Sequence, residues 1–342
     1  MTLSPSIPSS EHMEEQRLNM EFNQETQLWE HLNRAQVKLS LHPKQTRCFR
    51  SKATEILYGG AAGGGKSHLM RFKAIFWCIL IPFLPVYLFR RKSRDLILNH
   101  LEGPTGFRAM LWPLVQQKKV SIIGGQYPRI EFANGAKIFL CHCQHRSHLE
   151  NYQGPEMALL LIDELTHFEE DMYRFLRGRC RVPDSLEIPE QFRHLFPRIL
   201  CGSNPGSIGH GWVKRTFIDY NLPYEICEVP EDEGGMLRQF IPALVEDNPS
   251  LDKDKYKKSL SGLGSAELVR AMKYGDWDIA AGAFFDNFRR HLNVIEPFQI
   301  PDSWLKFRAM DDGFHYPFCV QWWCVSNDWH LDIPPGSRIL LS

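Results

Sequence analysis

Residues 59–67 read Gly-Gly-Ala-Ala-Gly-Gly-Gly-Lys-Ser, and from Gly60 onward they fit the pattern G-x-x-x-x-G-K-[ST] without a mismatch. Glycines let the backbone take positive φ and bring its N–H groups against phosphate oxygens. The apolar residues 56–58 predict a strand before the loop, and residues 68–77 predict a helix after it, with its N-terminus facing the phosphates. Because the pattern requires this context, we favour a phosphate-binding loop over a glycine-rich turn that matches by chance.

The loop residues have separate expected roles. Lys66 would reach the β- and γ-phosphates of a nucleoside triphosphate, and the hydroxyl of Ser67 would ligate Mg²⁺. The remaining positions would wrap the phosphates with their backbone: Gly60, Ala61, Ala62, Gly63, Gly64 and Gly65.

A second apolar run, residues 157–162, ends in the acidic pair Asp163 and Glu164. A continuous run of this kind suits a strand buried on both faces of a parallel sheet. Asp163 would hold the Mg²⁺ shell, and Glu164 would polarise a water for in-line attack on the γ-phosphate. Alone, the run could be a buried strand that ends in two solvated acids. Together with the loop, it argues for hydrolysis rather than binding alone.

A third apolar run, residues 198–202, is followed by Ser203 and Asn204. Ligands of parallel sheets bind outside the carboxyl ends of the strands, so these two side chains would sense the γ-phosphate and relay its presence. Taken by itself, Ser-Asn-Pro-Gly is better explained as an ordinary turn.

In this order the segments resemble the large terminase subunit of tailed bacteriophages, the ATP-driven motor that packages DNA into procapsids. The resemblance covers residues 40–325, and these segments carry it: residues 43–45, 59–67, 152–155, 159–164, 203–205, 240–251, 275–277, 282–285 and 310–313. It implies an α/β fold, namely a P-loop NTPase with a mainly parallel central sheet of the ASCE/RecA-like kind, followed by the beginning of an RNase H-like nuclease domain.

The expected organisation has four parts. Polar residues 1–25 predict a mobile tail. The P-loop ATPase domain would span residues 26–280, with a lid region near 224–280. A linker over 281–304 would lead to a truncated start of the nuclease domain at 305–342. There we expect one further strand, residues 318–325, and a tail.

The nuclease of this family needs two metal ions held by carboxylates from several strands. Asp311 supplies the first candidate ligand for Mg²⁺ or Mn²⁺, and Asp312 would point to the opposite face of its strand. The stretch after Gly313 leaves no room for the later ligands, so we expect no competent endonuclease. The chain would then be a natural truncation, an engineered fragment or a frameshift product.

The resemblance also raises two questions about the ATPase site. In the family, the position of Gln45 reads the adenine edge, although a surface glutamine is an equally good interpretation here. Many members carry a basic residue early in the loop, where this chain has alanines. An arginine would therefore come from elsewhere, in cis or from a neighbouring subunit, with these candidates: Arg90, Arg91, Arg179 and Arg181.

Composition narrows the remaining choices. The 342 residues suggest two domains, and 40 basic against 40 acidic residues give no support for DNA binding beyond local patches at 90–94 and 174–181, which could equally be solvated faces. Nine cysteines without a disulfide framework and an N-terminus without a signal core favour a cytosolic chain with reduced thiols, which the resemblance implies to be in the host cytoplasm. The apolar stretch 74–89 contains prolines, so a buried helix, a turn and a strand at 86–89 are expected rather than a membrane span.

Residues 141–148 contain two cysteines and three histidines that invite a zinc interpretation, but their spacing is too tight for the usual geometry. As partners, the resemblance implies double-stranded viral DNA, the portal protein, the small terminase subunit and further copies in a ring on the procapsid, transiently at the portal vertex. Two alternatives stay open: another P-loop nucleic-acid ATPase such as a helicase, and a truncated terminase that binds ATP without acting as a motor.

Overall fold

The computed structural model describes residues 40–263, 265–279, 294–311, 319–331 and 333–341. The chain divides into two compact units, residues 1–286 and 287–342, and each is described by itself. The tail expected at 1–25 and the first part of the expected linker, residues 281–293, lie outside the described residues.

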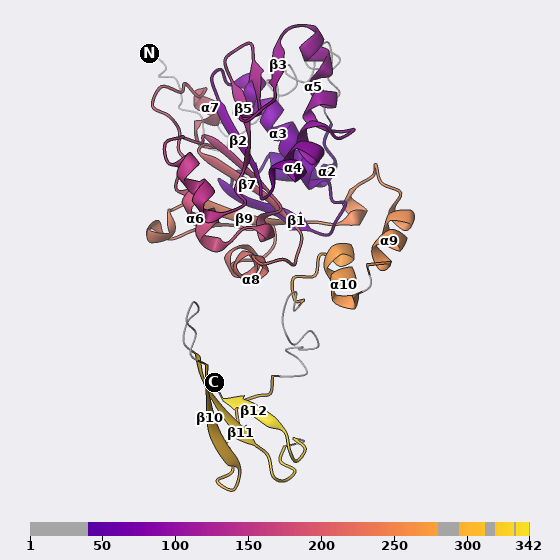
Figure 1. Ribbon diagram of the computed structural model, residues 1–342, viewed down its shortest axis with the longest axis vertical. Helices are drawn as coiled ribbons and strands as arrows, with labels where there is room; N and C mark the ends of the chain where they lie inside the picture. The colour runs from indigo at the N-terminus through magenta and orange to yellow at the C-terminus, as the bar shows by residue number, and fades with distance from the viewer. Residues whose placement is uncertain (1–39, 264, 280–293, 312–318, 332, 342) are drawn as a thin grey trace, which may run out of the picture. The chain divides into compact units, whose positions relative to one another are not determined.

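The first unit is built on a nine-stranded sheet with the order β3-β4-β5-β2-β6-β7-β1-β9-β8 (Figure 1). Its strands are β1 (Glu55–Gly60), β2 (Pro85–Arg90), β3 (Val120–Ile123), β4 (Arg129–Phe132), β5 (Lys137–His142), β6 (Leu159–Asp163), β7 (Arg198–Ser203), β8 (Ile226–Glu228) and β9 (Leu237–Ala243). The strands from β5 to β9 in this order are parallel, and antiparallel pairs extend the two edges. The predicted α/β fold with a mainly parallel sheet is confirmed.

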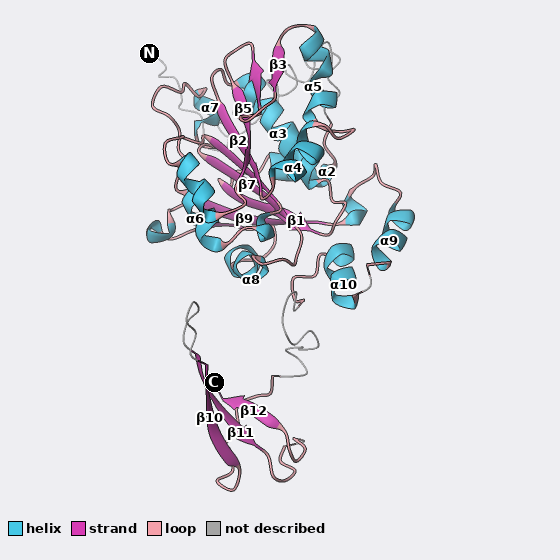
Figure 2. Ribbon diagram, viewed as in Figure 1, coloured by secondary structure: helices cyan, strands magenta, loops and turns pink. Residues whose placement is uncertain are grey.

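Helices cover both faces of this sheet (Figure 2). One face carries α2 (Pro43–Phe49), α3 (Lys66–Leu80), α4 (Ser93–Leu96), η1 (Ile97–Leu101), α5 (Phe107–Gln116) and α7 (Glu190–Arg193). The other carries η2 (Arg146–Tyr152), η3 (Leu165–His167), α6 (Glu170–Arg177), α8 (His210–Val213) and η4 (Lys214–Ile218). Two short turns, η5 (Glu231–Glu233) and η6 (Val245–Asp247), flank β9.

The apolar stretch 74–89 folds as predicted into the end of α3, a turn and β2. Residues 74–78 of α3 are all buried, which explains why this part of the stretch carries no charge. Among the described residues, no helix has the length and apolar character needed to cross a membrane.

The region expected to form a lid contains a strand of the main sheet. β9 pairs in parallel with β1, the strand that leads into the phosphate-binding loop. Only the segment after β9, with α9 (Lys253–Ser261) and α10 (Ala266–Tyr274), packs as a separate layer. This layer has its own small apolar cluster with Ala61, around Val245 and Leu260.

The second unit is a three-stranded antiparallel sheet of β10 (Leu305–Asp311), β11 (Cys319–Val325) and β12 (Arg338–Leu341). The strand expected at 318–325 is confirmed as β11, but the expectation that only a tail follows it is wrong. β12 pairs with β11, because Ile339 and Leu341 pack against a small core that includes Trp304. Asp311 ends β10 opposite Cys319, and Asp312 lies outside the described residues.

Candidate nucleotide-binding and hydrolysis site

The phosphate-binding loop follows the buried strand β1 and ends at the first residue of α3. Gly65 has a φ of 78°, and a Cβ there would lie 2.4 Å from Nε2 of Gln45, so only glycine fits. Within the described part of the chain, the backbone N–H groups of Gly63, Gly64 and Gly65 make no hydrogen bond. The loop therefore presents free donors at a helix N-terminus, as an anion-binding cradle requires.

Lys66 lies inside this cradle and is almost fully buried. Its Nζ donates to the carbonyl of Ala61 at 2.8 Å and to Oδ1 of Asn204 at 2.5 Å. Burial lowers the pKa of Lys66, while the carboxylates of Glu164 and Asp163 act in the opposite direction. One N–H of the ammonium is left for a phosphate oxygen.

The acidic pair lies at the carboxyl end of β6, the strand that neighbours β7 in the sheet. Oδ2 of Asp163 lies 3.4 Å from the hydroxyl of Ser67, its expected co-ligand. Glu164 takes the left-handed conformation, with φ 56° and ψ 57°, which for a non-glycine residue costs about 1–2 kcal/mol. Such backbone strain concentrates at functional sites.

His100 contacts Asp163 of this pair and was not found from the sequence. It comes from η1, is completely buried, and its Nε2 lies 2.9 Å from Oδ2 of Asp163. Burial lowers the pKa of His100, so the imidazole is neutral and Nε2–H donates to the carboxylate. Burial would raise the pKa of Asp163, but the hydrogen bond from His100 and the charges of Arg90 and Lys66 lower it to about 2. Asp163 is therefore ionised.

Of the four arginine candidates, the structure brings only Arg90 to the acidic pair. Its guanidinium lies 3.6 Å from Asp163 and 3.7 Å from Glu164. The other three are engaged elsewhere: Arg91 with Glu169 and Met172, Arg179 with the carbonyl of Gln153, and Arg181 with Glu156.

Ser203 ends β7 and Asn204 follows it, and their side chains reach two different parts of the site. While Asn204 contacts Lys66, the hydroxyl of Ser203 lies 2.8 Å from that of Thr166 and accepts the Thr166 N–H at 3.0 Å. Thr166 belongs to η3, immediately after Glu164. The end of β7 thus joins the lysine of the loop to the turn that carries the acidic pair.

Gln45 is buried, so the interpretation as a surface glutamine is wrong. Its Nε2 donates to the carbonyl of Gly65 at 2.8 Å, and its Oε1 accepts the N–H of His42. These bonds brace the phosphate-binding loop from behind. A role in reading adenine stays a prediction.

The layer after β9 holds the other side of the loop. The side-chain amide of Asn248 donates to the carbonyl of Gly63 at 2.7 Å, and the N–H of Ala62 donates to the carbonyl of Met272 at 2.8 Å. Sequence reasoning singled out the segment around Asn248 but assigned it no role, because the partner lies far away in the chain.

The donors present fit a magnesium ion. Oδ1 of Asp163 is buried without a hydrogen-bond partner, and the hydroxyl of Ser67 stands beside the same carboxylate. Mg²⁺ is commonly held by one or two carboxylates together with substrate phosphates. In the described ranges, no group of three or more His, Cys, Asp or Glu side chains is arranged to hold a metal, and this includes residues 141–148.

Solved structures resemble this chain, whereas no protein-family model and no curated protein matches it. The large terminase from a thermophilic bacteriophage superimposes with a TM-score of 0.52 and 17% identity over 84% of this chain and 66% of that one. The chain has the large terminase fold.

Two further structures of the same thermophilic phage terminase show this fold. The complex with ADP matches with a TM-score of 0.51, covering 84% of this chain and 66% of that one at 17% identity. The complex with ATP-gamma-S matches with a TM-score of 0.50, covering 84% and 65% at 17% identity. The chain thus spans about two thirds of the length of the large terminases it matches.

Proposed function

We propose that the chain is an ATP-hydrolysing motor subunit of the large terminase kind, which translocates viral double-stranded DNA into procapsids. One observation supports this proposal most directly. Several polar side chains lie together at the carboxyl ends of neighbouring parallel strands: Lys66, Asn204, Asp163, Glu164 and Arg90. The terminase fold supports ATP as the nucleotide, because structures of the thermophilic phage terminase contain ATP-gamma-S and ADP.

Each group of residues in the site has its own proposed role in hydrolysis. The N–H groups of the loop and Lys66 hold the phosphates, and Ser67 with Asp163 would hold Mg²⁺, which supplies charge neutralisation when bound. Burial and the neighbouring charge of Asp163 raise the pKa of Glu164, which makes it a better acceptor for the proton of the attacking water. Arg90 is placed to offset the charge that develops on the transferred phosphoryl group.

Two contacts connect the phosphates to the rest of the protein. A phosphate bound by the remaining N–H of Lys66 would pull on an ammonium that also donates to Asn204, so the end of β7 would respond to its presence. The carbonyl of Gly63 accepts a hydrogen bond from Asn248, so a movement of the loop would also shift the layer of α9 and α10. Ser203 and Asn204 are therefore proposed as coupling residues.

From the terminase fold we also propose the partners and the location of the protein. They include DNA, the portal protein, the small terminase subunit and a ring of copies at the portal vertex in the host cytoplasm. Asp311 as a first ligand for Mg²⁺ or Mn²⁺, without the further ligands of a competent endonuclease, stays a prediction, since the structure describes only the backbone position of that residue.

The test is phosphate release from ATP by the purified chain, with and without duplex DNA. Glu164→Gln should lower turnover by roughly 10²-fold with nucleotide binding retained, and Lys66→Ala should abolish productive binding. Glu150→Gln removes an exposed carboxylate elsewhere and should change neither. Parental turnover in Glu164→Gln would refute the assignment, and ATP-dependent strand separation would favour the helicase alternative.

A further inference from the structure

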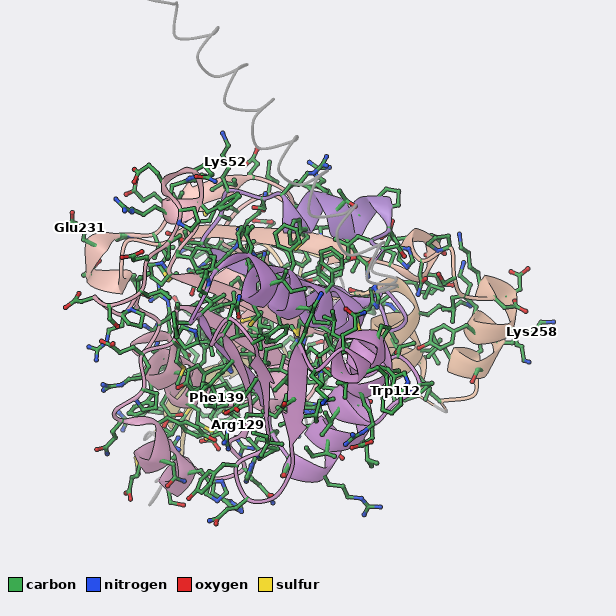
Figure 3. All side chains as sticks on the ribbon, turned by 90° about the horizontal axis from the view of Figure 1, so that it is seen from above. Lys52, Trp112, Arg129, Phe139, Glu231 and Lys258 are labelled. Carbon is green, nitrogen blue, oxygen red and sulfur yellow. The ribbon has the colours of Figure 1, made fainter. Side chains whose placement is uncertain are left out.

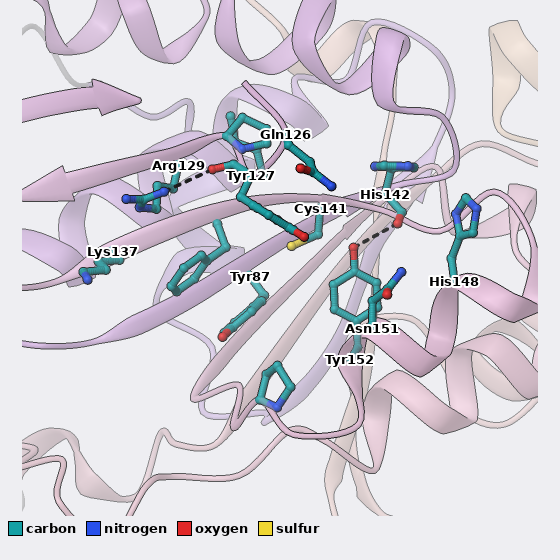
Figure 4. Close-up of a pocket in the computed structure, with 14 residues that line it drawn as sticks. Tyr87, Gln126, Tyr127, Arg129, Lys137, Cys141, His142, His148, Asn151 and Tyr152 are labelled. Atoms are coloured by element: carbon teal, nitrogen blue, oxygen red, sulfur yellow. Dashed lines mark hydrogen bonds between the residues drawn. The ribbon is translucent and has the colours of Figure 1, made fainter. Parts of the chain in front are cut away.

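A cavity of about 620 Å³ lies over β2 and β5, apart from the nucleotide site (Figure 4). It opens on the face of the sheet that carries η2, since Tyr87 and Phe139 pack with the core cluster on that side. The alternate residues of the same strands, such as Val86 and Ile138, pack with the cluster around α3 on the other face. The cavity is thus separated from the phosphate-binding loop by the sheet.

Tyrosine and phenylalanine rings line one part of this pocket. Tyr87 and Phe139 stack with their ring centroids 4.6 Å apart and an interplanar angle of 21°. Tyr152 stands beside them, held by its hydroxyl, which donates to the carbonyl of His142 at 3.0 Å. Tyr127, on the loop before β4, is 72% exposed and lines the same pocket. A planar ligand could stack against these rings on more than one side.

The polar groups of the pocket suit a planar ligand with hydrogen-bonding edges. The side-chain amides of Gln126 and Asn151 line it and make no hydrogen bond within the described part of the chain. Each offers both a donor and an acceptor. Burial lowers the pKa of His142, with a smaller effect of His148, so this ring is a neutral neighbour.

The charge of the pocket is positive at one end. Figure 4 shows Arg129 and Lys137 together at the side opposite His148. Both share Glu131, at 2.8 Å and 3.6 Å, which leaves one net positive charge there. No aspartate or glutamate is among the residues that line the pocket. An anionic group on the ligand is therefore favoured at this end.

We propose that this pocket binds one nucleotide, with its base on the Tyr87–Phe139 pair, its edge at the free amides and its phosphate toward Arg129 and Lys137. Stacking on aromatic side chains beside a cationic track is how proteins hold unpaired nucleotides. The nucleotide comes either free in solution or as an unpaired residue of a strand. This inference does not depend on ATP hydrolysis, because the pocket shares no residue with the loop or the acidic pair.

The experiment measures binding of fluorescein-labelled single-stranded dT₁₀ by anisotropy and of dTMP by calorimetry, using the full chain. The monophosphate lacks the β- and γ-phosphates that the loop clamps, so it separates the two sites. Tyr127→Ala and Lys137→Ala alter exposed side chains and leave the core intact. Trp112→Ala and Lys258→Ala are the matched controls, since Figure 3 shows both well away from Arg129 and Phe139.

We expect Tyr127→Ala and Lys137→Ala each to weaken binding by about fivefold or more, with both controls at the parental value. Loss confined to dT₁₀ identifies a nucleotide of a strand, and loss that includes dTMP identifies the free nucleotide. Lys66→Ala should leave this binding unchanged even if it abolishes ATP hydrolysis. Undetectable binding to the parent, or equal binding by all variants, overturns the proposal. The proposal is also overturned if the two pocket variants differ from the parent only in self-association, measured by sedimentation, because the pocket would then be a protein contact.

Discussion

The ammonium of Lys66 donates a 2.5 Å hydrogen bond to the side-chain oxygen of Asn204. This bond joins the phosphate-binding loop to the end of β7, two elements whose strands pair directly in the sheet. Because Lys66 also holds the carbonyl of Ala61, its position is set by groups on both sides. Asn204 is the side chain that contacts the lysine directly, which is why we propose it as a coupling residue.

Asn204→Ala should therefore slow hydrolysis more than it weakens nucleotide binding. A hydrogen bond to a charged group contributes about 1.5–3 kcal/mol, so single-turnover hydrolysis should fall by roughly 10- to 100-fold if that contribution is used in the reaction. Asn327→Ala, which removes an exposed amide in the second unit, is the control. Equal losses in affinity and turnover would show that Asn204 only helps to bind the nucleotide.

Arg90→Ala should lower turnover by about 10³-fold or more if Arg90 supplies the stabilising charge, whereas Arg181→Ala should have little effect. The structure places Arg90 beside the acidic pair of its own chain, so mixing Arg90→Ala with Glu164→Gln should restore no activity. Recovery in the mixture would mean that the arginine acts across a subunit boundary.

His100→Asn should raise the Mg²⁺ concentration needed for half-maximal hydrolysis by about 10- to 100-fold, as is typical when a partner that orients a metal ligand is lost. Nucleotide binding without added Mg²⁺ should persist, and a thermal unfolding curve would separate this effect from misfolding. His145→Asn, at an exposed histidine, is the control. An unchanged Mg²⁺ dependence in a folded variant would contradict the role.

Lys73→Met should stabilise the fold at pH 7 by about 1–3 kcal/mol, because the buried ammonium of Lys73 has no hydrogen-bond partner among the described residues. Burial, with a smaller effect of Arg198, lowers the pKa of Lys73 well below 10.5. The unfolded chain then binds more protons between the two pKa values, so the stability of the parent rises with pH across that window.

Urea unfolding at pH 7 and pH 9.5 measures this effect. The variant should be more stable at pH 7 and show a smaller gain in stability between the two pH values than the parent. Lys258→Met, at an exposed lysine, should behave like the parent. A destabilised Lys73→Met with the parental pH dependence would show that the lysine is charged and solvated in the folded protein.

The phosphate-binding loop, the acidic pair and the strands that carry them could be predicted because each is a contiguous segment with its own pattern. The run before Asp163 is apolar without interruption and becomes the buried strand β6. β12 was missed because its short run becomes a strand only through pairing with β11. β9 was assigned to a lid because nothing in its own residues indicates that it pairs with β1.

The sequence by itself determined the loop between β1 and α3 and the place of Asp163 and Glu164 at the end of a buried strand, since neighbouring residues specify these elements locally. The tertiary structure decided which distant side chains join them. His100 contacts Asp163, and Arg90 is the one of the four candidate arginines that lies beside the acidic pair. The side chain of Gln45 is buried against the phosphate-binding loop. Each of these contacts depends on the order of strands in the sheet, which is set by the packing of the whole domain and leaves no local signal in the chain.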